Sequence, residues 1–91
     1  MAKIIDPLCL RVLLVEDDED DYFLFQEVLE EIEGTQFDLT WASSFDAAFH
    51  QIQQNQHDVC LCDYQLGAQN GIDLLKKGMT LGHSIPMIML T

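Results

Sequence analysis

Acidic residues follow two apolar segments of the chain at the points where those segments end. Glu16 and Asp17 come directly after the apolar run 9–15, and Asp63 comes directly after the run 59–62. If these runs are neighbouring parallel strands, their carboxyl ends meet at one edge of the sheet. Carboxylates held close together raise one another's pKa values, and a hard cation such as Mg²⁺ relieves that repulsion. The sequence therefore predicts a magnesium site built from these three side chains.

The remaining acids of the run 16–21 have a simpler interpretation. Residues 18–21 lead straight into a helical pattern, and negative charge at a helix N-terminus is favourable because it complements the helix dipole. We therefore assign residues 18–21 to the start of a helix. We keep the proposed cation site for Glu16, Asp17 and Asp63, because each follows an apolar strand.

Strand and helix patterns alternate along the chain, beginning and ending with a strand. The runs 9–15, 59–62 and 85–90 are almost continuously apolar, which is typical of strands buried on both faces of a parallel sheet. Residues 37–41 alternate between apolar and polar, which indicates a half-exposed edge strand. Helical spacing of apolar residues appears in three intervening segments: Phe25, Val28, Leu29, Ile32; Phe45, Ala48, Phe49, Ile52; and Ile72, Leu75, Met79.

This alternation predicts an α/β fold, a doubly wound parallel sheet with helices on both faces. Placing the half-exposed strand 37–41 at an edge and the apolar strands inside gives the flavodoxin-like strand order 2-1-3-4, with a further element expected beyond strand four. Gly34 is expected to stop the first helix. Ser43 and Asp46 have the spacing of a capping box for the second.

Composition limits the domain count and the partners. The 91 residues suit one domain, and 48% of them are hydrophobic, enough for a core. A net charge of -12 argues against DNA, RNA or an anionic membrane as the main partner. No apolar run approaches the roughly 20 residues of a membrane helix, and the N-terminus lacks a signal-peptide core, so a cytoplasmic location is expected. Cys60 and Cys62 are predicted to be buried core thiols, because no further Cys or His supports a zinc site.

Three segments together carry a family resemblance: LLVEDDEDD (13–21), CDYQLGAQNG (62–71) and PMIMLT (86–91). In this order and spacing they resemble the receiver domains of response regulators in bacterial two-component signalling, such as the chemotaxis regulators. The resemblance spans nearly the whole chain and implies an incomplete receiver domain over residues 1–91, which ends at the fourth strand. The family's last helix, strand and helix are absent, and with them its active-site lysine and aromatic switch residue. Lys3, Lys76 and Lys77 do not match that lysine, and Gly67 stands where the family often has proline.

The resemblance also implies roles for the site residues. Asp63 looks like the phosphoacceptor and a metal ligand, Asp17 like a direct Mg²⁺ ligand, and Glu16 like a ligand acting through water. Gln65 looks like the residue whose backbone carbonyl binds Mg²⁺ and whose N–H contacts the phosphoryl group. Thr91 resembles the hydroxyl that hydrogen-bonds that group. The implied phosphodonor is a sensor histidine kinase or a histidine phosphotransfer domain, and the chain is expected to be a switch rather than a turnover enzyme.

Two other functions remain open at this point. A small phosphatase or hydrolase could use Asp63 as a nucleophile, but such enzymes usually carry a second acid two residues later, where Gln65 stands. A receiver-fold interaction module that is not phosphorylated is the other. The fourth strand is apolar on both faces, so we expect the 91 residues either to be a piece of a longer chain or to associate through this face, for example as a homodimer. Mg²⁺-dependent labelling by a small phosphodonor distinguishes the phosphorylated switch from the interaction module.

Overall fold

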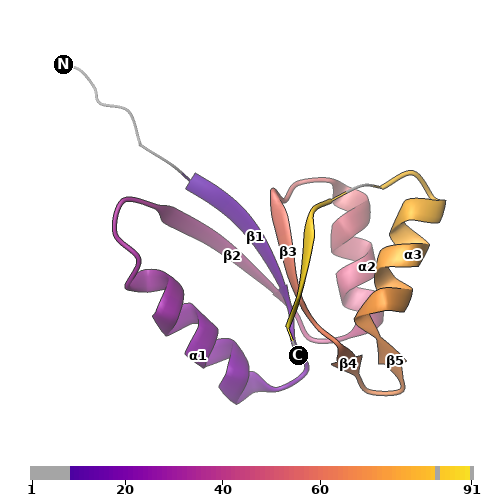
Figure 1. The fold of residues 1–91 in the computed structure, drawn as a ribbon, viewed down its shortest axis with the longest axis horizontal. Helices are drawn as coiled ribbons and strands as arrows, with labels where there is room; N and C mark the ends of the chain where they lie inside the picture. Colours follow the sequence, from indigo (N-terminus) through magenta and orange to yellow (C-terminus); the bar gives the residue numbers. More distant parts are fainter. Residues whose placement is uncertain (1–8, 84, 91) are drawn as a thin grey trace.

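The computed structural model describes residues 9–83 and 85–90 of the 91-residue chain. Strands and helices alternate along it as the sequence predicts, apart from two additional short strands that follow the third strand (Figure 1). The elements are β1 (Cys9–Val15), α1 (Glu19–Glu30), β2 (Gln36–Ala42), α2 (Phe45–Gln54), β3 (Val59–Asp63), β4 (Gln65–Leu66), β5 (Gln69–Asn70), α3 (Gly71–Thr80) and β6 (Met87–Leu90).

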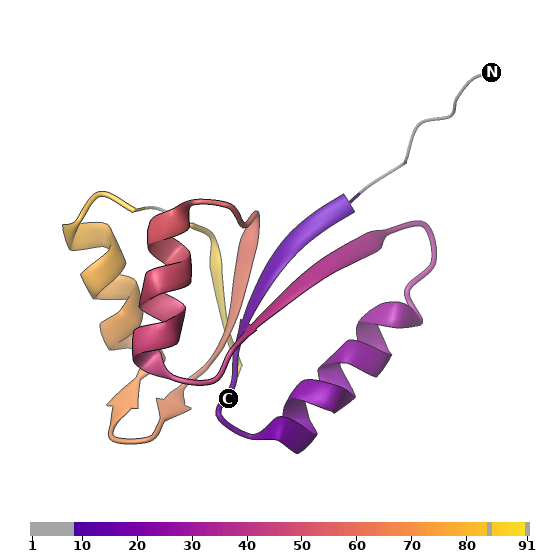
Figure 2. The ribbon, with the colours of Figure 1, turned by 180° about the vertical axis from the view of Figure 1, so that it is seen from behind.

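The main sheet has four parallel strands in the order β2-β1-β3-β6. Since β6 is the fourth strand of this sheet, the order is the predicted 2-1-3-4. Helix α1 lies on one side of the sheet, and α2 and α3 lie together on the other (Figures 1 and 2). The architecture is therefore a flavodoxin-like α/β fold, as predicted.

Strand β1 is central in the sheet, with a hydrogen-bonded neighbour along each edge, and its residues from Val12 to Val15 are buried. It pairs with β2 along its whole length and with β3 from Val12 to Val15. Leu13 and Leu14 point to opposite faces of the sheet, and neither has any exposed surface. The continuous apolar run of this strand thus reflects its central position.

The larger core lies between the sheet and helices α2 and α3. Cys60 and Cys62 of β3 are completely buried in this layer, as predicted for core thiols, whereas Cys9 is exposed. The buried members of the cluster are Leu13, Val15, Ala42, Phe45, Ala48, Ile52, Cys60, Cys62, Leu66 and Leu74. This layer holds the carboxyl ends of β1 and β3 in a fixed register.

Helix α1 differs from its predicted form. It ends at Glu30, before Ile32 and Gly34, because the next two amides bond to carbonyls three residues back and tighten the turn. Gly34 then takes a positive φ of 84°. Val28 is 49% exposed, so the helix buries less of its apolar face against the sheet than expected.

The second helix begins one residue later than predicted. Ser44, not Ser43, is the N-cap, and its Oγ accepts a hydrogen bond of 3.1 Å from the Ala47 N–H. Strand β2 lies at a sheet edge, as the alternating pattern predicts. Strand β6 is the other edge among the described residues, and Ile88 at its middle is 53% exposed.

Candidate metal and phosphoryl site

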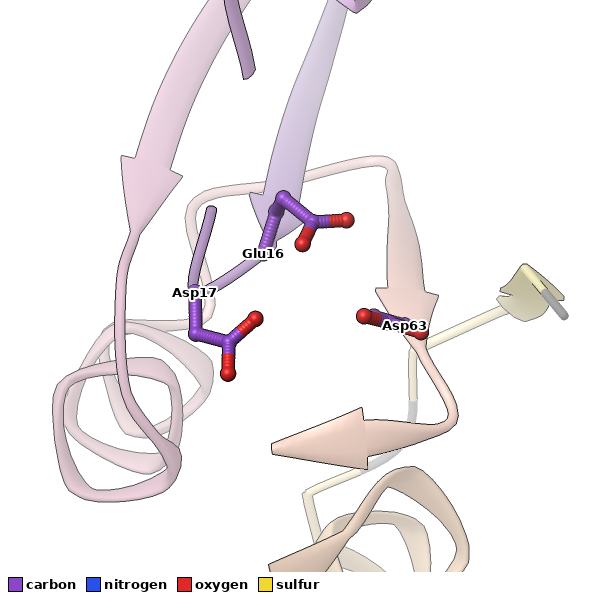
Figure 3. Close-up of side chains that lie close together, drawn as sticks. All are labelled: Glu16, Asp17 and Asp63. Atoms are coloured by element: carbon purple, nitrogen blue, oxygen red, sulfur yellow. The ribbon is translucent and has the colours of Figure 1, made fainter. Parts of the chain in front are cut away.

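Three carboxylates meet at the carboxyl edge of the sheet. Glu16 and Asp17 directly follow β1, and Asp63 is the last residue of β3. These strands are neighbours, with Val15 opposite Cys62, so the residues that follow lie side by side. Each side chain offers one oxygen, and these oxygens all lie within 4.8 Å of one another (Figure 3). The convergence predicted from the sequence is confirmed.

Glu16 is the most constrained of the three. Its side chain is only 4% exposed, and its Oε1 accepts a hydrogen bond of 3.2 Å from the Asp18 N–H. Burial is the main reason that the pKa of Glu16 rises to about 7; the charges of Asp63, Asp21 and Asp17 raise it further, and the Asp18 hydrogen bond opposes them. Near neutral pH, Glu16 therefore carries either a proton or a buried negative charge.

This donor set fits a hard divalent cation. All three side chains offer carboxylate oxygens, which Mg²⁺ prefers, and Asp17 is exposed, so water has room to complete the coordination. A cation also stabilises the charged form of Glu16, which burial disfavours.

Asp18 caps helix α1 beside this site. Its side chain accepts a hydrogen bond of 2.9 Å from the Asp20 N–H, and Glu19, Asp20 and Asp21 fill the first turn. The helix-start role predicted for residues 18–21 is confirmed.

Trp41 contacts the site in a way that the sequence reasoning missed. Its Nε1–H donates a hydrogen bond of 2.7 Å to the backbone carbonyl of Glu16. Its ring stacks on that of Tyr22, with centroids 4.4 Å apart and planes 7° from parallel. The only sequence signal was the alternation in β2, which puts an aromatic residue near the strand's carboxyl end.

The family model of the response regulator receiver domain matches residues 12–91 of the chain. The chain belongs to the receiver domain family. It is 29% identical over 82 residues to the transcriptional regulatory protein ZraR of Escherichia coli K12, a match over 90% of this chain but only 18% of ZraR. The receiver domain thus spans less than a fifth of that relative's length.

Solved structures show the same fold. A mutant MaeR response regulator bound to sulfate superposes with a TM-score of 0.79 at 23% identity, covering 91% of this chain and 67% of MaeR. The receiver domain of the Francisella response regulator 1452 gives a TM-score of 0.75 at 28% identity, covering 88% of this chain and 64% of that one. Among the described residues of this receiver domain, no helix is long and apolar enough to cross a membrane.

The loop after Asp63 contains a short hairpin that the sequence reasoning did not predict. Strands β4 and β5 pair antiparallel, joined by Gly67 and Ala68. Gly67 has a φ of 65°, a left-handed conformation closed to proline, whose ring holds φ near −65°. The glycine found in place of the family's frequent proline thus accompanies a turn that proline cannot form. Gln65, whose backbone is the predicted ligand, opens this hairpin two residues after Asp63.

Gly71 lets helix α3 begin against the end of β3. Its N–H donates a hydrogen bond of 2.8 Å to the Tyr64 carbonyl. A Cβ atom at this position would lie 2.8 Å from Met89 Sδ, and 3.0 Å from both the Asp63 carbonyl oxygen and Cys62 Sγ. The receiver domain therefore needs a glycine here to bring the helix this close to Asp63.

Lys76 and Lys77 lie in helix α3 and not at the end of a strand, as the sequence predicts. Lys77 Nζ lies 4.3 Å from the ring centroid of Phe49 and 5.6 Å from that of Phe45, a cation–π contact between α3 and α2. Thr91, the predicted phosphoryl hydroxyl, and Lys3 lie outside the described residues.

Proposed function

We propose that this receiver domain accepts a phosphoryl group on Asp63 from a phosphohistidine of a sensor kinase or a histidine phosphotransfer domain, with Mg²⁺ held by Glu16, Asp17 and Asp63. The observation that carries the proposal is the cluster of three carboxylates within 4.8 Å at the carboxyl edge of a parallel sheet. Family membership supports a signalling role for the same edge.

Asp63 suits the acceptor position because of its place on β3. It ends a strand paired on both sides, and its side chain remains partly exposed, so a donor can approach in line with a carboxylate oxygen. Attack forms an acyl phosphate while the bond from phosphorus to the histidine nitrogen breaks. The loose transition state of such transfers needs positioning and charge neutralisation more than covalent help.

The other groups divide those tasks. Bound Mg²⁺ would neutralise charge on the phosphoryl oxygens. We propose that the Gln65 carbonyl contributes to the metal site and that its N–H contacts the phosphoryl group. The Thr91 hydroxyl is proposed to hydrogen-bond the same group. Such a domain is a switch that assists its own phosphorylation, and a location in the cytoplasm fits its proposed kinase partner.

Labelling with acetyl phosphate and Mg²⁺ tests the acceptor. Mass spectrometry should show one added phosphoryl group on the unaltered receiver domain and none on Asp63→Asn. The matched control is Asp38→Asn, which makes the same change on an exposed residue of β2 and should label normally. Equal labelling of Asp63→Asn and the unaltered chain would contradict the assignment.

Calorimetric titration with Mg²⁺ tests the metal site separately. The double variant Asp17→Ala, Asp63→Ala removes two of the three carboxylates and should abolish binding, whereas Asp38→Asn should retain it. If the double variant binds Mg²⁺ as tightly as the unaltered domain, the metal site lies elsewhere.

A second candidate function is an interaction module that is not phosphorylated. Exposed apolar side chains on two elements favour it: Leu24 is 58% exposed and Val28 49% on α1, and Ile88 is 53% exposed on β6. Homodimerisation through the β6 face is one form of this proposal. Sedimentation should then show a dimer that Ile88→Lys dissociates, and labelling of Asp63 should fail.

A further inference from the structure

The peptide bond that leads into Asp17 is held from the end of β2. The N–H of Glu16 donates a hydrogen bond of 3.1 Å to the Ala42 carbonyl, which continues the strand pairing. The carbonyl of Glu16 accepts the 2.7 Å hydrogen bond from the Trp41 indole. Because this carbonyl belongs to the planar peptide between Glu16 and Asp17, its direction fixes where the Asp17 backbone begins.

The same tryptophan is held in turn by helix α1. Its ring stacks on Tyr22, one turn after the Asp18 N-cap. Asp18 directly follows Asp17, and its N–H donates to Glu16 Oε1 at 3.2 Å. The contacts therefore close a ring from Glu16 through Asp18, α1 and Tyr22 to Trp41, and back to the Glu16 carbonyl.

Asp17 lies inside this ring of contacts and depends on it. Its side chain is exposed, so core packing does little to fix it. Its position relative to Asp63 follows from the backbone on either side, which Trp41 and Asp18 hold. Metal ligands lose affinity when the groups that orient them are removed.

We propose that Trp41 is a positioning residue for the acidic site, whose indole N–H aligns the Glu16–Asp17 peptide for cation binding. The proposal rests on the function proposed for Glu16, Asp17 and Asp63. It adds that the end of β2, which supplies no carboxylate to the cluster, sets the affinity of the site. It also makes Trp41, the only tryptophan of the chain, a built-in reporter of occupancy.

The test compares Trp41→Phe with Phe37→Leu. Phenylalanine retains a ring that can stack on Tyr22 but has no N–H to donate. Phe37 lies on the same face of β2 at the opposite end of the strand, so its truncation controls for a general loss of packing. Affinity is measured with Mn²⁺ as the probe, from the electron paramagnetic resonance signal of the unbound ion. Urea unfolding of each variant is measured in parallel.

Trp41→Phe should weaken Mn²⁺ binding about three- to tenfold, the factor expected for the loss of one neutral hydrogen bond. Phe37→Leu should lower stability and leave the affinity unchanged. In the unaltered domain, the single indole N–H signal in the ¹H–¹⁵N spectrum should shift saturably as Mg²⁺ is added. If Trp41→Phe does not fold, replacing Trp41 by benzothienylalanine, in which sulfur takes the place of the N–H, makes the same comparison.

The outcomes separate the two proposals. Unchanged affinity in Trp41→Phe, with normal binding by the unaltered domain, overturns the role of Trp41 and leaves the metal site intact. Equal losses in Trp41→Phe and Phe37→Leu also overturn it, because they show a general packing effect. Absence of binding by the unaltered domain overturns both the metal site and the role of Trp41.

Discussion

Glu16 gives the sharpest quantitative prediction, because it is the single buried charged side chain among the residues that the structure describes. Replacing it with glutamine removes the ionisable group but keeps a similar volume. The glutamine also retains a side-chain oxygen that can accept the hydrogen bond from the Asp18 N–H. Glu16→Gln therefore isolates the cost of a buried negative charge.

The magnitude follows from the pKa of Glu16, which burial raises from 4.5 to about 7. In the unfolded chain this carboxyl ionises at the lower value, so between these pH values the folded state binds more protons than the unfolded state. The stability that the group contributes is thus fully present below about pH 4.5 and is lost as the pH rises through about 7. The difference corresponds to about 3 kcal/mol of unfolding free energy.

The assay is urea unfolding of the unaltered domain and Glu16→Gln between pH 5 and pH 8, with EDTA to remove divalent cations. At pH 8 the variant should be more stable by up to about 3 kcal/mol, and near pH 5 the gap should nearly close. Glu30→Gln, which changes an exposed glutamate on α1, is the matched control and should show no such gap. Saturating Mg²⁺ should stabilise the unaltered domain more than Glu16→Gln. A variant that is less stable than the unaltered domain at pH 8 would refute the reasoning.

Two further predictions concern the elements around the site. Gly71→Ala should destabilise the domain by about 1–3 kcal/mol in urea unfolding, because the new Cβ would overlap Met89 Sδ and crowd the Asp63 carbonyl; an unchanged midpoint would show that α3 shifts freely. Ser44→Ala should cost about 1 kcal/mol through loss of the N-cap bond to Ala47, whereas Ser43→Ala should cost little. Equal effects of the two serine changes would contradict the assigned cap.

The sheet and the acidic site could be predicted from the sequence because both depend on strand position. A doubly buried strand needs a continuous apolar run, and the residues that end parallel strands must gather at one edge. The convergence of Glu16, Asp17 and Asp63 could therefore be predicted from the sequence. The half-polar pattern of residues 37–41 likewise identified β2 as an edge strand.

Features set by the backbone or by side-chain direction could not be predicted in the same way. Two adjacent serines have the same capping chemistry, and only the extended backbone of Ser44 decides between them. The hydrogen bond from Trp41 to the Glu16 carbonyl depends on how α1 packs against β2, which no local sequence pattern predicts. The β4–β5 hairpin has two residues in each strand, too short for an alternating pattern.

The alternation of side chains along β3 has a consequence for how this domain tolerates insertions and deletions. Cys60 and Cys62 face the helical core, whereas Asp63, the last residue of β3, alternates to the opposite face of the sheet. Adding or removing one residue between Val59 and Cys62 would exchange the two faces and turn the Asp63 carboxylate toward the core. Length change within this segment is thus more disruptive than most substitutions. The surface connection after α1 is not a strand, so a change in its length does not exchange buried and exposed faces.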